Sequence, residues 1–594
     1  MEKMHTVVEK NGYRAACGGA AYIRVNAIDD QITEFVFGFA RGAVSDREAE
    51  IEYSFPAVDI AGIWYPDCGT DRRLKADWSP AVETMMSISA PVMCFYNNKG
   101  ENIHTAALSE VKRRVSSFCG IREEDGKIIC RFSITVPGDF FLNEYRISIW
   151  RSDKKEPFWN SLQKTRRFWE SGEDYFAMEA PEAAREPVYS FWYSYHQNVT
   201  EKIIEEESRR AKELGYSTVI VDDGWQTEDN KRGYAFCGDW KPSKVKFKDF
   251  AAHVGRVKKM GLRYMLWFPV PYMGVEAENF TRFKDKLLTF DEKSRAGILD
   301  IRYPEVREYL KGIYIRAVRD WGVDGLKLDF IDEFYLRDDS PAYGEGMDFA
   351  DVQEALGELL SVTTEELKKL RTDIMIEFRQ RYVGPEIRRY GNILRVVDCP
   401  GSAVANRLGT IDLRLLSGDT AVHSDMLMWH TDETVENAAL QMVSCLFSTV
   451  QLSVRLDEIS DEQKQMIRFW TEFQKSHRIL LQKTQIEPEQ PHDLYPSVRV
   501  RNHAGAEELE AAYAGNQYVD MRNRENTFFY VHACGECSVI LEADRNRGRR
   551  CVIKNCMGEV VSEFGIAAGE IRRVWMPEAG ILCSKADEEE VKNR

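Results

Sequence analysis

Between residues 188 and 480, short apolar segments alternate with longer amphipathic ones, and this alternation constrains the fold more than any other feature of the sequence. Apolar runs bounded by turn residues are typical of buried strands, whereas apolar positions spaced three and four apart predict helices. The predicted strands are 188–195, 217–222, 263–268, 324–330, 373–378, 393–397, 412–416 and 449–454. Eight strands separated by helices in a segment of this length predict a single (β/α)₈ barrel.

A doubly wound open sheet is the alternative that the same alternation allows. Such a fold normally carries a glycine-rich phosphate-binding turn after its first strand. Here the first strand ends in Tyr193-Ser-Tyr-His-Gln-Asn, which contains no glycine. The sequence therefore favours the barrel.

The flanking regions are strand-rich. Alternating segments such as Lys127-Ile-Ile-Cys-Arg-Phe-Ser-Ile-Thr-Val predict an N-terminal β-sandwich, and Asn526-Thr-Phe-Phe-Tyr-Val-His is typical of a C-terminal antiparallel β-domain. An acidic, proline-containing stretch at 171–187 separates the first region from the barrel. We expect three domains, at 1–180, 187–484 and 488–585, followed by a solvated tail from Lys585.

Charge and cysteine usage limit the classes of partner. The chain has 80 Lys and Arg against 96 Asp and Glu, a net charge of −16, which disfavours nucleic acid and anionic lipid surfaces. No apolar run approaches the length of a membrane span, and no secretion signal is recognised at the N-terminus. The 13 cysteines are scattered and odd in number, which favours reduced thiols and a cytoplasmic location.

The fourth predicted strand, within Val323-Asp-Gly-Leu-Lys-Leu-Asp-Phe, ends in charged residues. Side chains alternate along a strand, so Lys327 and Asp329 share one face at the mouth of the barrel. A neighbouring ammonium keeps a carboxylate ionised, as a nucleophile requires. The alternative is a structural ion pair that closes a layer of the barrel.

The sixth predicted strand ends at Asp398, just before a Pro-Gly turn. A retaining glycosidase needs a second carboxyl about 5 Å from its nucleophile, and Asp398 is the candidate for this acid. Asp425, in His423-Ser-Asp-Met-Leu-Met-Trp-His, is the second candidate. Asp398 could instead be a turn residue or a helix cap.

Further polar and aromatic residues stand at the ends of the other strands. Val219-Ile-Val-Asp-Asp-Gly-Trp-Gln places Asp222 and Asp223 together, where they can accept hydrogen bonds from neighbouring hydroxyls or, alternatively, ligate a metal. Trp267 could stack on a sugar face or close the core. Arg379 and Arg395 are candidate hydroxyl donors, with surface or ion-pair arginine as the alternative.

Cys534-Gly-Glu-Cys537 has the spacing of half a zinc site, but Cys551 and Cys556 do not supply a matching half, and buried thiols are the favoured interpretation. We expect no metal and no cofactor.

Assembled, these motifs resemble the melibiase-type α-galactosidases of glycoside hydrolase family 36. The resemblance rests on Val221-Asp-Asp-Gly-Trp-Gln, on Gly325-Leu-Lys-Leu-Asp-Phe and on the strand end from Arg395 to Asp398. It covers nearly the whole chain and implies an N-terminal β-supersandwich, a catalytic barrel and a C-terminal β-sandwich.

The resemblance also implies residue roles. It places the nucleophile on Asp329 and the acid/base on Asp398. It implies that Asp222 and Asp223 bind the sugar hydroxyls. It also implies that the remaining candidates make further contacts with the substrate. These are Trp225, Trp267, Lys327, Arg379, Arg395 and Asp425.

The expected function is a retaining α-galactosidase acting on an oligosaccharide or glycoside, as a monomer or a homo-oligomer. An α-N-acetylgalactosaminidase or a transglycosylase of the raffinose-synthase kind is the alternative within the class, because Glu377-Phe-Arg-Gln-Arg-Tyr replaces the small Cys-Gly-Gly type segment found near the sugar 2-substituent in that family. A sugar-binding protein on a non-catalytic barrel is the alternative from another class.

Overall fold

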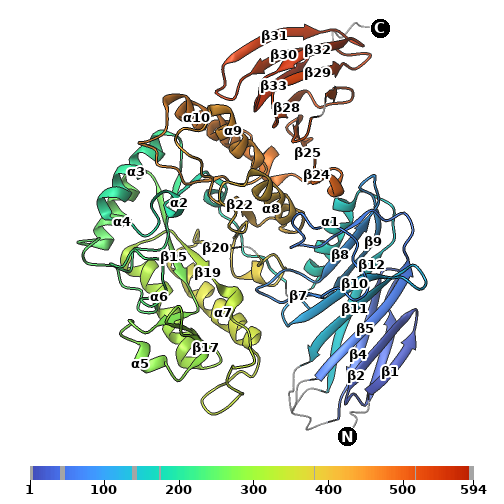
Figure 1. Ribbon diagram of the computed structural model, residues 1–594, viewed down its shortest axis with the longest axis vertical. Helices are drawn as coiled ribbons and strands as arrows, with labels where there is room; N and C mark the ends of the chain where they lie inside the picture. The colour runs from blue at the N-terminus through green and yellow to red at the C-terminus, as the bar shows by residue number, and fades with distance from the viewer. Residues whose placement is uncertain are drawn as a thin grey trace.

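The computed structural model describes residues 5–40, 47–136, 143–172, 175–379, 381–515 and 517–587. It has three regions: a β-sandwich near the N-terminus, a barrel of strands and helices in the middle, and a second β-structure near the C-terminus (Figure 1). The predicted fold class is thus confirmed. The predicted tail was expected to begin at Lys585, but Lys585 lies in the last strand. Residues 588–594 lie outside the described residues.

The described part of the N-terminal region forms two sheets that enclose an apolar core, which includes Phe35, Ile51 and Phe132. One sheet has the order β1 (His5–Lys10), β2 (Tyr13–Gly18), β5 (Arg47–Pro56), β11 (Lys127–Val136), β10 (Val115–Arg122) and β7 (Val82–Thr84). The other has the order β3 (Tyr22–Ala27), β4 (Ile32–Gly38), β12 (Glu144–Ser152), β9 (Asn102–Leu108), β8 (Val92–Tyr96) and β6 (Gly62–Trp64). Helix α1 (Phe158–Glu170) follows and contacts β8, β9 and β12.

The described residues of the middle region contain eight barrel strands. In barrel order they are β13 (Val188–Ser190), β14 (Thr218–Val221), β15 (Arg263–Pro269), β19 (Gly325–Asp329), β20 (Met375–Arg379), β21 (Ile393–Arg395), β22 (Ala421–His423) and β23 (Gln451–Leu452). Neighbouring strands from β23 through β13 to β22 pair in parallel, and a bridge from His423 to Thr449 joins β22 to the segment before β23. The mouth of the barrel therefore gathers the carboxyl ends of all these strands.

Helices surround the barrel (Figure 1). They are α2 (Trp192–Tyr195), α3 (Glu201–Glu213), α4 (Phe250–Lys259), α6 (Pro304–Trp321), α7 (Val352–Leu370), α8 (Ala403–Leu416), α9 (Val435–Ser444) and α10 (Asp461–Ser476). A small sheet after β15 contains β16 (Tyr272–Gly274), β17 (Leu287–Asp291) and β18 (Ala296–Leu299), with the short helix α5 (Phe280–Phe283).

Two of the predicted strands need correction. The segment 412–416 is the last part of α8, and the seventh barrel strand is β22. Helix α8 is buried on several sides, and its Asp412 pairs with Arg72 of the N-terminal sandwich at 3.0 Å. Within this helix the segment Asp412-Leu-Arg-Leu-Leu alternates polar and apolar residues, as a strand does, because the polar Asp412 and Arg414 are buried with partners inside the protein. The first strand ends at Ser190, and α2 takes the rest of the predicted segment.

The C-terminal region packs two sheets around a core that includes Phe528, Leu541 and Ile553. One sheet has the order β24 (Ile486–Pro488), β25 (Ser497–Asn502), β26 (Glu507–Ala512), β28 (Thr527–His532), β33 (Gly580–Ala586), β30 (Arg549–Lys554) and β31 (Val560–Ile566). The other has the order β27 (Tyr518–Asp520), β29 (Cys537–Glu542) and β32 (Ile571–Met576). This region lies at the far end of the barrel from β17 (Figure 1).

Candidate active site at the mouth of the barrel

Asp329 ends β19 and is held by three groups. The indole Nε1 of Trp267 donates a hydrogen bond to Oδ2 at 3.0 Å, and the backbone N–H of Phe330 donates to Oδ1 at 2.9 Å. The guanidinium of Arg379 forms an ion pair with Oδ1, with Nε at 2.7 Å. These contacts give the carboxylate one orientation at the carboxyl end of the fourth strand, where barrel enzymes place reacting groups.

Phe330 supports this arrangement through an unusual backbone. Its φ of 61° lies in the left-handed region, which costs a non-glycine residue about 1–3 kcal/mol. The conformation turns its ring under the guanidinium of Arg379, whose Cζ lies 4.5 Å from the ring centroid. The same ring contacts the stacked rings of Tyr234 and Tyr272 edge-on. A cation above an aromatic face is attracted to it, so this stack helps to position Arg379.

Arg379 also reaches the second candidate carboxylate. Its Nη1 lies 3.4 Å from Oδ2 of Asp398, and Arg395 contacts Oδ1 of the same carboxylate at 2.8 Å. Burial opposes ionisation of Asp398, but the charges of Arg395, Lys327 and Arg379 outweigh it and lower its pKa to about 2. The Asp398 side chain is 43% exposed, so it is ionised and accessible at the mouth.

Asp425 lies behind Asp398 and is completely enclosed. Its Oδ1 pairs with Arg395 at 2.6 Å, and its Oδ2 accepts hydrogen bonds from the backbone N–H of Cys399 and from the hydroxyl of Tyr193. Burial raises the pKa of Asp425, partly offset by Arg395. Because these partners already occupy both oxygens, we interpret Asp425 as the group that anchors Arg395 and the turn at Cys399.

Asp222 and Asp223 lie side by side after β14. The ammonium of Lys327 pairs with Oδ2 of Asp222 at 2.6 Å, and both groups are buried. The amides of Gln197 and Gln226 each donate to Asp223 at 2.7 Å. Burial raises the pKa of Asp223 to about 6, although these hydrogen bonds lower it.

The turn that follows these carboxylates requires a glycine. Gly224 has a φ of 113°, and a Cβ there would lie 2.5 Å from the Cα of Gln197. A side chain at this position would push apart the segments that carry Gln197 and Asp223.

The contacts of Lys327, Trp225 and Trp267 differ from those predicted from the sequence. The cation in contact with Asp329 is Arg379, whereas Lys327 pairs with Asp222. Trp225 is 0% exposed and donates its indole N–H to the carbonyl of Trp267, so it belongs to the core behind the site and offers no face to a sugar. Trp267 is also buried, and it contributes a hydrogen-bond donor to Asp329 rather than an open stacking surface.

Sequence reasoning did not identify several supporting residues. Glu377 of β20 is buried, accepts a hydrogen bond from Gln451 at 2.6 Å, and has the ring of His423 3.0 Å away and Arg395 at 3.8 Å. Glu377 and Arg379 are two residues apart on β20, so strand alternation places their side chains on the same face. This spacing is the signal in the sequence that could have identified Glu377. Tyr193 lies in α2 and Gln197 follows this helix, and no spacing in the sequence links them to Asp425 or Asp223.

Among the described residues, no group of three or more His, Cys, Asp and Glu side chains is arranged to hold a metal ion. Cys534 and Cys537 both approach the ring of His532, with sulfur to nitrogen distances of 3.6 and 3.5 Å. In the part of the chain that the structure describes, no helix combines the length and apolarity needed to cross a bilayer.

A known protein family matches part of the barrel. The family model described as Melibiase matches residues 179–344, a segment that includes Asp222, Asp223, Lys327 and Asp329. The match spans the barrel strands from β13 to β19.

Two curated relatives align with part of the chain. The α-galactosidase of Escherichia coli is 25% identical over 156 residues, which are 25% of this chain and 22% of that protein. The α-galactosidase Mel36A of Lactobacillus acidophilus is 24% identical over 147 residues, 23% of this chain and 19% of that protein. These alignments therefore span about a fifth of either relative.

Solved structures extend the likeness to the whole fold. The family 36 α-galactosidase AgaA of Geobacillus stearothermophilus superimposes with a TM-score of 0.66 at 14% identity, covering 97% of this chain and 81% of that one. The α-galactosidase of Lactobacillus brevis gives 0.64 at 11% identity, covering 100% and 84%. The three-region architecture is thus that of family 36 structures.

Proposed function

We propose that this chain is a retaining α-glycosidase that hydrolyses terminal α-galactosyl residues. The observation that carries the proposal is the placement of Asp329 and Asp398 on a single guanidinium at the mouth of a melibiase-type barrel. The pairs of carboxyl groups that cleave glycosides lie about 5–9.5 Å apart, a span that one bridging arginine can cover. The names of the two curated relatives and of the family 36 structures support galactose as the sugar.

In this proposal Asp329 attacks the anomeric carbon. Its orientation by Trp267 and Phe330 directs one oxygen, and its charge is balanced by Arg379 until the new bond forms. The carboxylate then becomes a glycosyl ester and loses its charge. Arg379 is left to interact with Asp398, whose ionised form is the one that can activate the water for the second step.

The first step needs Asp398 in its protonated form, because the leaving oxygen takes that proton. With a pKa near 2, Asp398 cannot supply it while both arginines contact it. We therefore infer that substrate entering between the two carboxylates separates Arg379 from Asp398. Losing one cationic neighbour raises the pKa of the acid when the sugar is bound.

Asp222 and Asp223 would accept hydrogen bonds from sugar hydroxyls at the opposite side of Asp329. A structure of AgaA in complex with stachyose is among the related folds, which supports an oligosaccharide substrate here.

The test is hydrolysis of a panel of p-nitrophenyl α-glycosides that differ only in the sugar, with the first-formed anomer followed by NMR. We expect the galactoside to react fastest and to release the α-anomer. Preference for the 2-acetamido sugar would indicate an α-N-acetylgalactosaminidase, and transfer to a sugar acceptor would indicate a transglycosylase. Binding of galactose without turnover of any glycoside would contradict the proposal in favour of a binding protein.

A further inference from the structure

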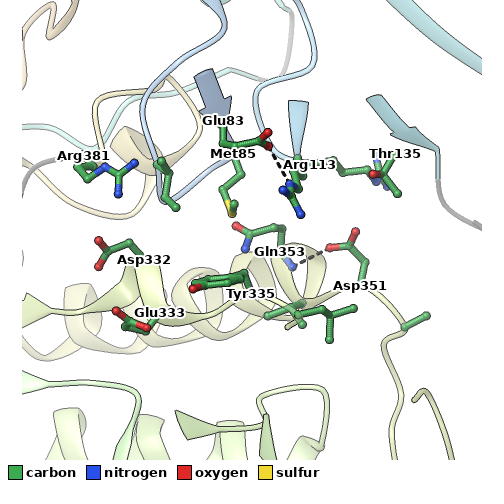
Figure 2. Close-up of a pocket in the computed structure, with 15 residues that line it drawn as sticks. Glu83, Met85, Arg113, Thr135, Asp332, Glu333, Tyr335, Asp351, Gln353 and Arg381 are labelled. Carbon is green, nitrogen blue, oxygen red and sulfur yellow. Dashed lines mark hydrogen bonds and ion pairs between the residues drawn. The ribbon is translucent and has the colours of Figure 1, made fainter. Parts of the chain in front are cut away.

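A cavity of about 440 Å³ lies where the N-terminal sandwich meets the barrel loop that follows Asp329. The sandwich contributes Met85 and Ile88 to its lining, and the barrel side contributes Leu336 and Val352 (Figure 2). Pockets of this size hold a molecule with several fused or linked rings.

We propose that this cavity receives the leaving group of the glycoside, and that this leaving group is an apolar ring system. The inference rests on the proposed function, and it names the class of substrate: α-galactosides of aromatic or alicyclic alcohols.

The charged side chains at the rim already have partners within the protein, and aliphatic side chains line the space between the two walls. Asp332 accepts a hydrogen bond from the hydroxyl of Tyr382 at 2.8 Å, and Asp351 accepts two from the backbone at the start of α7. The remaining rim charges form ion pairs: Glu83 with Arg114, Arg113 with Glu354, Glu333 with Arg337, and Arg381 with Asp67. A sugar-binding subsite would instead need free polar groups for each hydroxyl, because unmatched hydroxyls are costly to desolvate.

Gln353 belongs to the barrel wall of the cavity. It is 5% exposed, and its amide nitrogen donates to the carbonyl of Phe334 at 2.6 Å. Its Oε1 and the Nε of Arg113 are enclosed within the walls, so neither atom offers a hydrogen bond to an occupant of the cavity. Figure 2 shows the two side chains approaching from opposite walls.

Tyr335 contributes an aromatic ring to the lining of the cavity. The guanidinium of Arg337 covers it, with Cζ 3.8 Å from the ring centroid. The ring is therefore held rigidly beside the cavity, where its edge can contact another ring.

Two residues that line the cavity follow the reacting groups closely in the chain. Asp332 follows Asp329 by three residues and Arg381 follows Arg379 by two, so their Cα atoms are at most about 10 Å and 7 Å apart. Asp332 also interacts electrostatically with Arg379 and Asp329. In barrel order, β19 and β20 carry these loops, whereas Asp222 and Asp223 follow β14 on the other side of the nucleophile. The sugar and its leaving group would thus extend in opposite directions from Asp329.

The experiment uses the full chain and two substrates, 2-naphthyl α-galactoside and methyl α-galactoside. In Leu336→Asp, we expect kcat/KM for the naphthyl glycoside to fall about tenfold, as expected for loss of one buried leucine contact. The value for the methyl glycoside should stay within about twofold, because no group on it reaches the cavity. Comparing each variant with the unsubstituted protein on the same substrate removes the difference in leaving-group reactivity.

Leu370→Asp is the matched control, since Leu370 is an exposed leucine at the far end of α7 from the cavity. It should alter neither substrate. Equal losses on both substrates in Leu336→Asp would overturn the inference.

A second measurement does not depend on catalysis. Titration with free 2-naphthol, followed by calorimetry, should show binding to the unsubstituted protein and to Leu370→Asp. Ala350→Trp, which fills the cavity from its exposed rim, should abolish binding. Binding that persists in Ala350→Trp would overturn the inference even if the galactosides are hydrolysed. Loss of binding in Ala350→Trp with no turnover of any galactoside would support the cavity as a ring-binding site and contradict the proposed function.

Discussion

Nε of Arg379 lies 2.7 Å from Oδ1 of Asp329, and the same guanidinium reaches Asp398. One cation therefore contacts both candidate catalytic carboxylates. Arg395 holds Asp398 from the other side, and Asp425 in turn holds Arg395. The site is a chain of alternating charges, in which a change at one member alters the proton affinity of the next.

Replacing Asp329 by Asn should abolish turnover, because the neutral amide cannot form the glycosyl ester. The smaller Asp329→Gly leaves space on the face opposite the leaving group, and added azide should then yield β-galactosyl azide, identified by NMR. Residual activity near that of the unsubstituted protein in Asp329→Asn would refute the assignment of the nucleophile.

Asp398→Ala should reduce activity on raffinose-type oligosaccharides far more than on p-nitrophenyl galactoside, since only the poor leaving group needs protonation. The measurement is the dependence of kcat/KM on the pKa of the leaving group over a series of aryl galactosides. Asp425→Ala is the comparison variant, and we expect it to lower activity on both substrate types alike by displacing Arg395. If Asp425→Ala instead shows the leaving-group dependence, the acid is Asp425.

Arg379→Gln should raise the pKa of Asp398, because it removes a cation that stabilises the ionised form. The acid must be protonated for the first step, so activity on a poor leaving group declines as pH rises above its pKa. The basic limb of the pH profile of kcat/KM should therefore move to higher pH in the variant. An unmoved limb would show that the ion pair does not control Asp398.

Arg379 lies in the segment Glu377-Phe-Arg-Gln-Arg-Tyr, which replaces the small segment near the sugar 2-substituent in family 36, so the sequence predicts that Arg379 recognises the 2-position. Comparison of a galactoside with its 2-deoxy analogue in Arg379→Ala tests this prediction. We expect losses of similar size on both sugars, since both carboxylate partners of Arg379 belong to the catalytic pair. A loss of activity confined to the parent sugar would show that Arg379 does recognise the 2-position.

Asp223 should make sugar binding dependent on pH. Its pKa is raised to about 6 by burial, so it is ionised at pH 7.5 and largely protonated near pH 5. We expect KM to rise as pH falls through about 6, because the protonated carboxyl is a weaker acceptor for sugar hydroxyls. In Asp223→Asn, KM should be higher by about tenfold or more, the value of a charged hydrogen bond, and should lose this pH dependence. A KM profile that is unchanged by the substitution would contradict the role in binding.

Lys327→Met should destabilise the fold, since it leaves the buried carboxylate of Asp222 without its cation. Removing one member of a buried pair typically costs about 3–5 kcal/mol. The shift of the urea midpoint of unfolding measures the effect. The double variant Lys327→Met with Asp222→Asn should recover part of the loss, and a double variant as unstable as the single one would argue against the pair.

The sequence by itself determined the three-region architecture and the barrel, because hydrophobic periodicity reports which faces are buried. It also determined that Asp329 and the pair Asp222 and Asp223 stand at strand ends, since those positions follow from local alternation. It predicted a strand at 412–416, where the tertiary structure has a helix, because burial on several sides removed the helical period.

Only the tertiary structure decided the partners. That Arg379 rather than Lys327 contacts Asp329, that Trp225 is closed into the core, and that Asp425 anchors Arg395 all depend on contacts between strands far apart in the chain. The cavity beside Leu336 has the same origin, since its walls come from the sandwich and from the loop after β19. Periodicity encodes which way a side chain faces, whereas the neighbour it meets is set by barrel closure and by the docking of the sandwich.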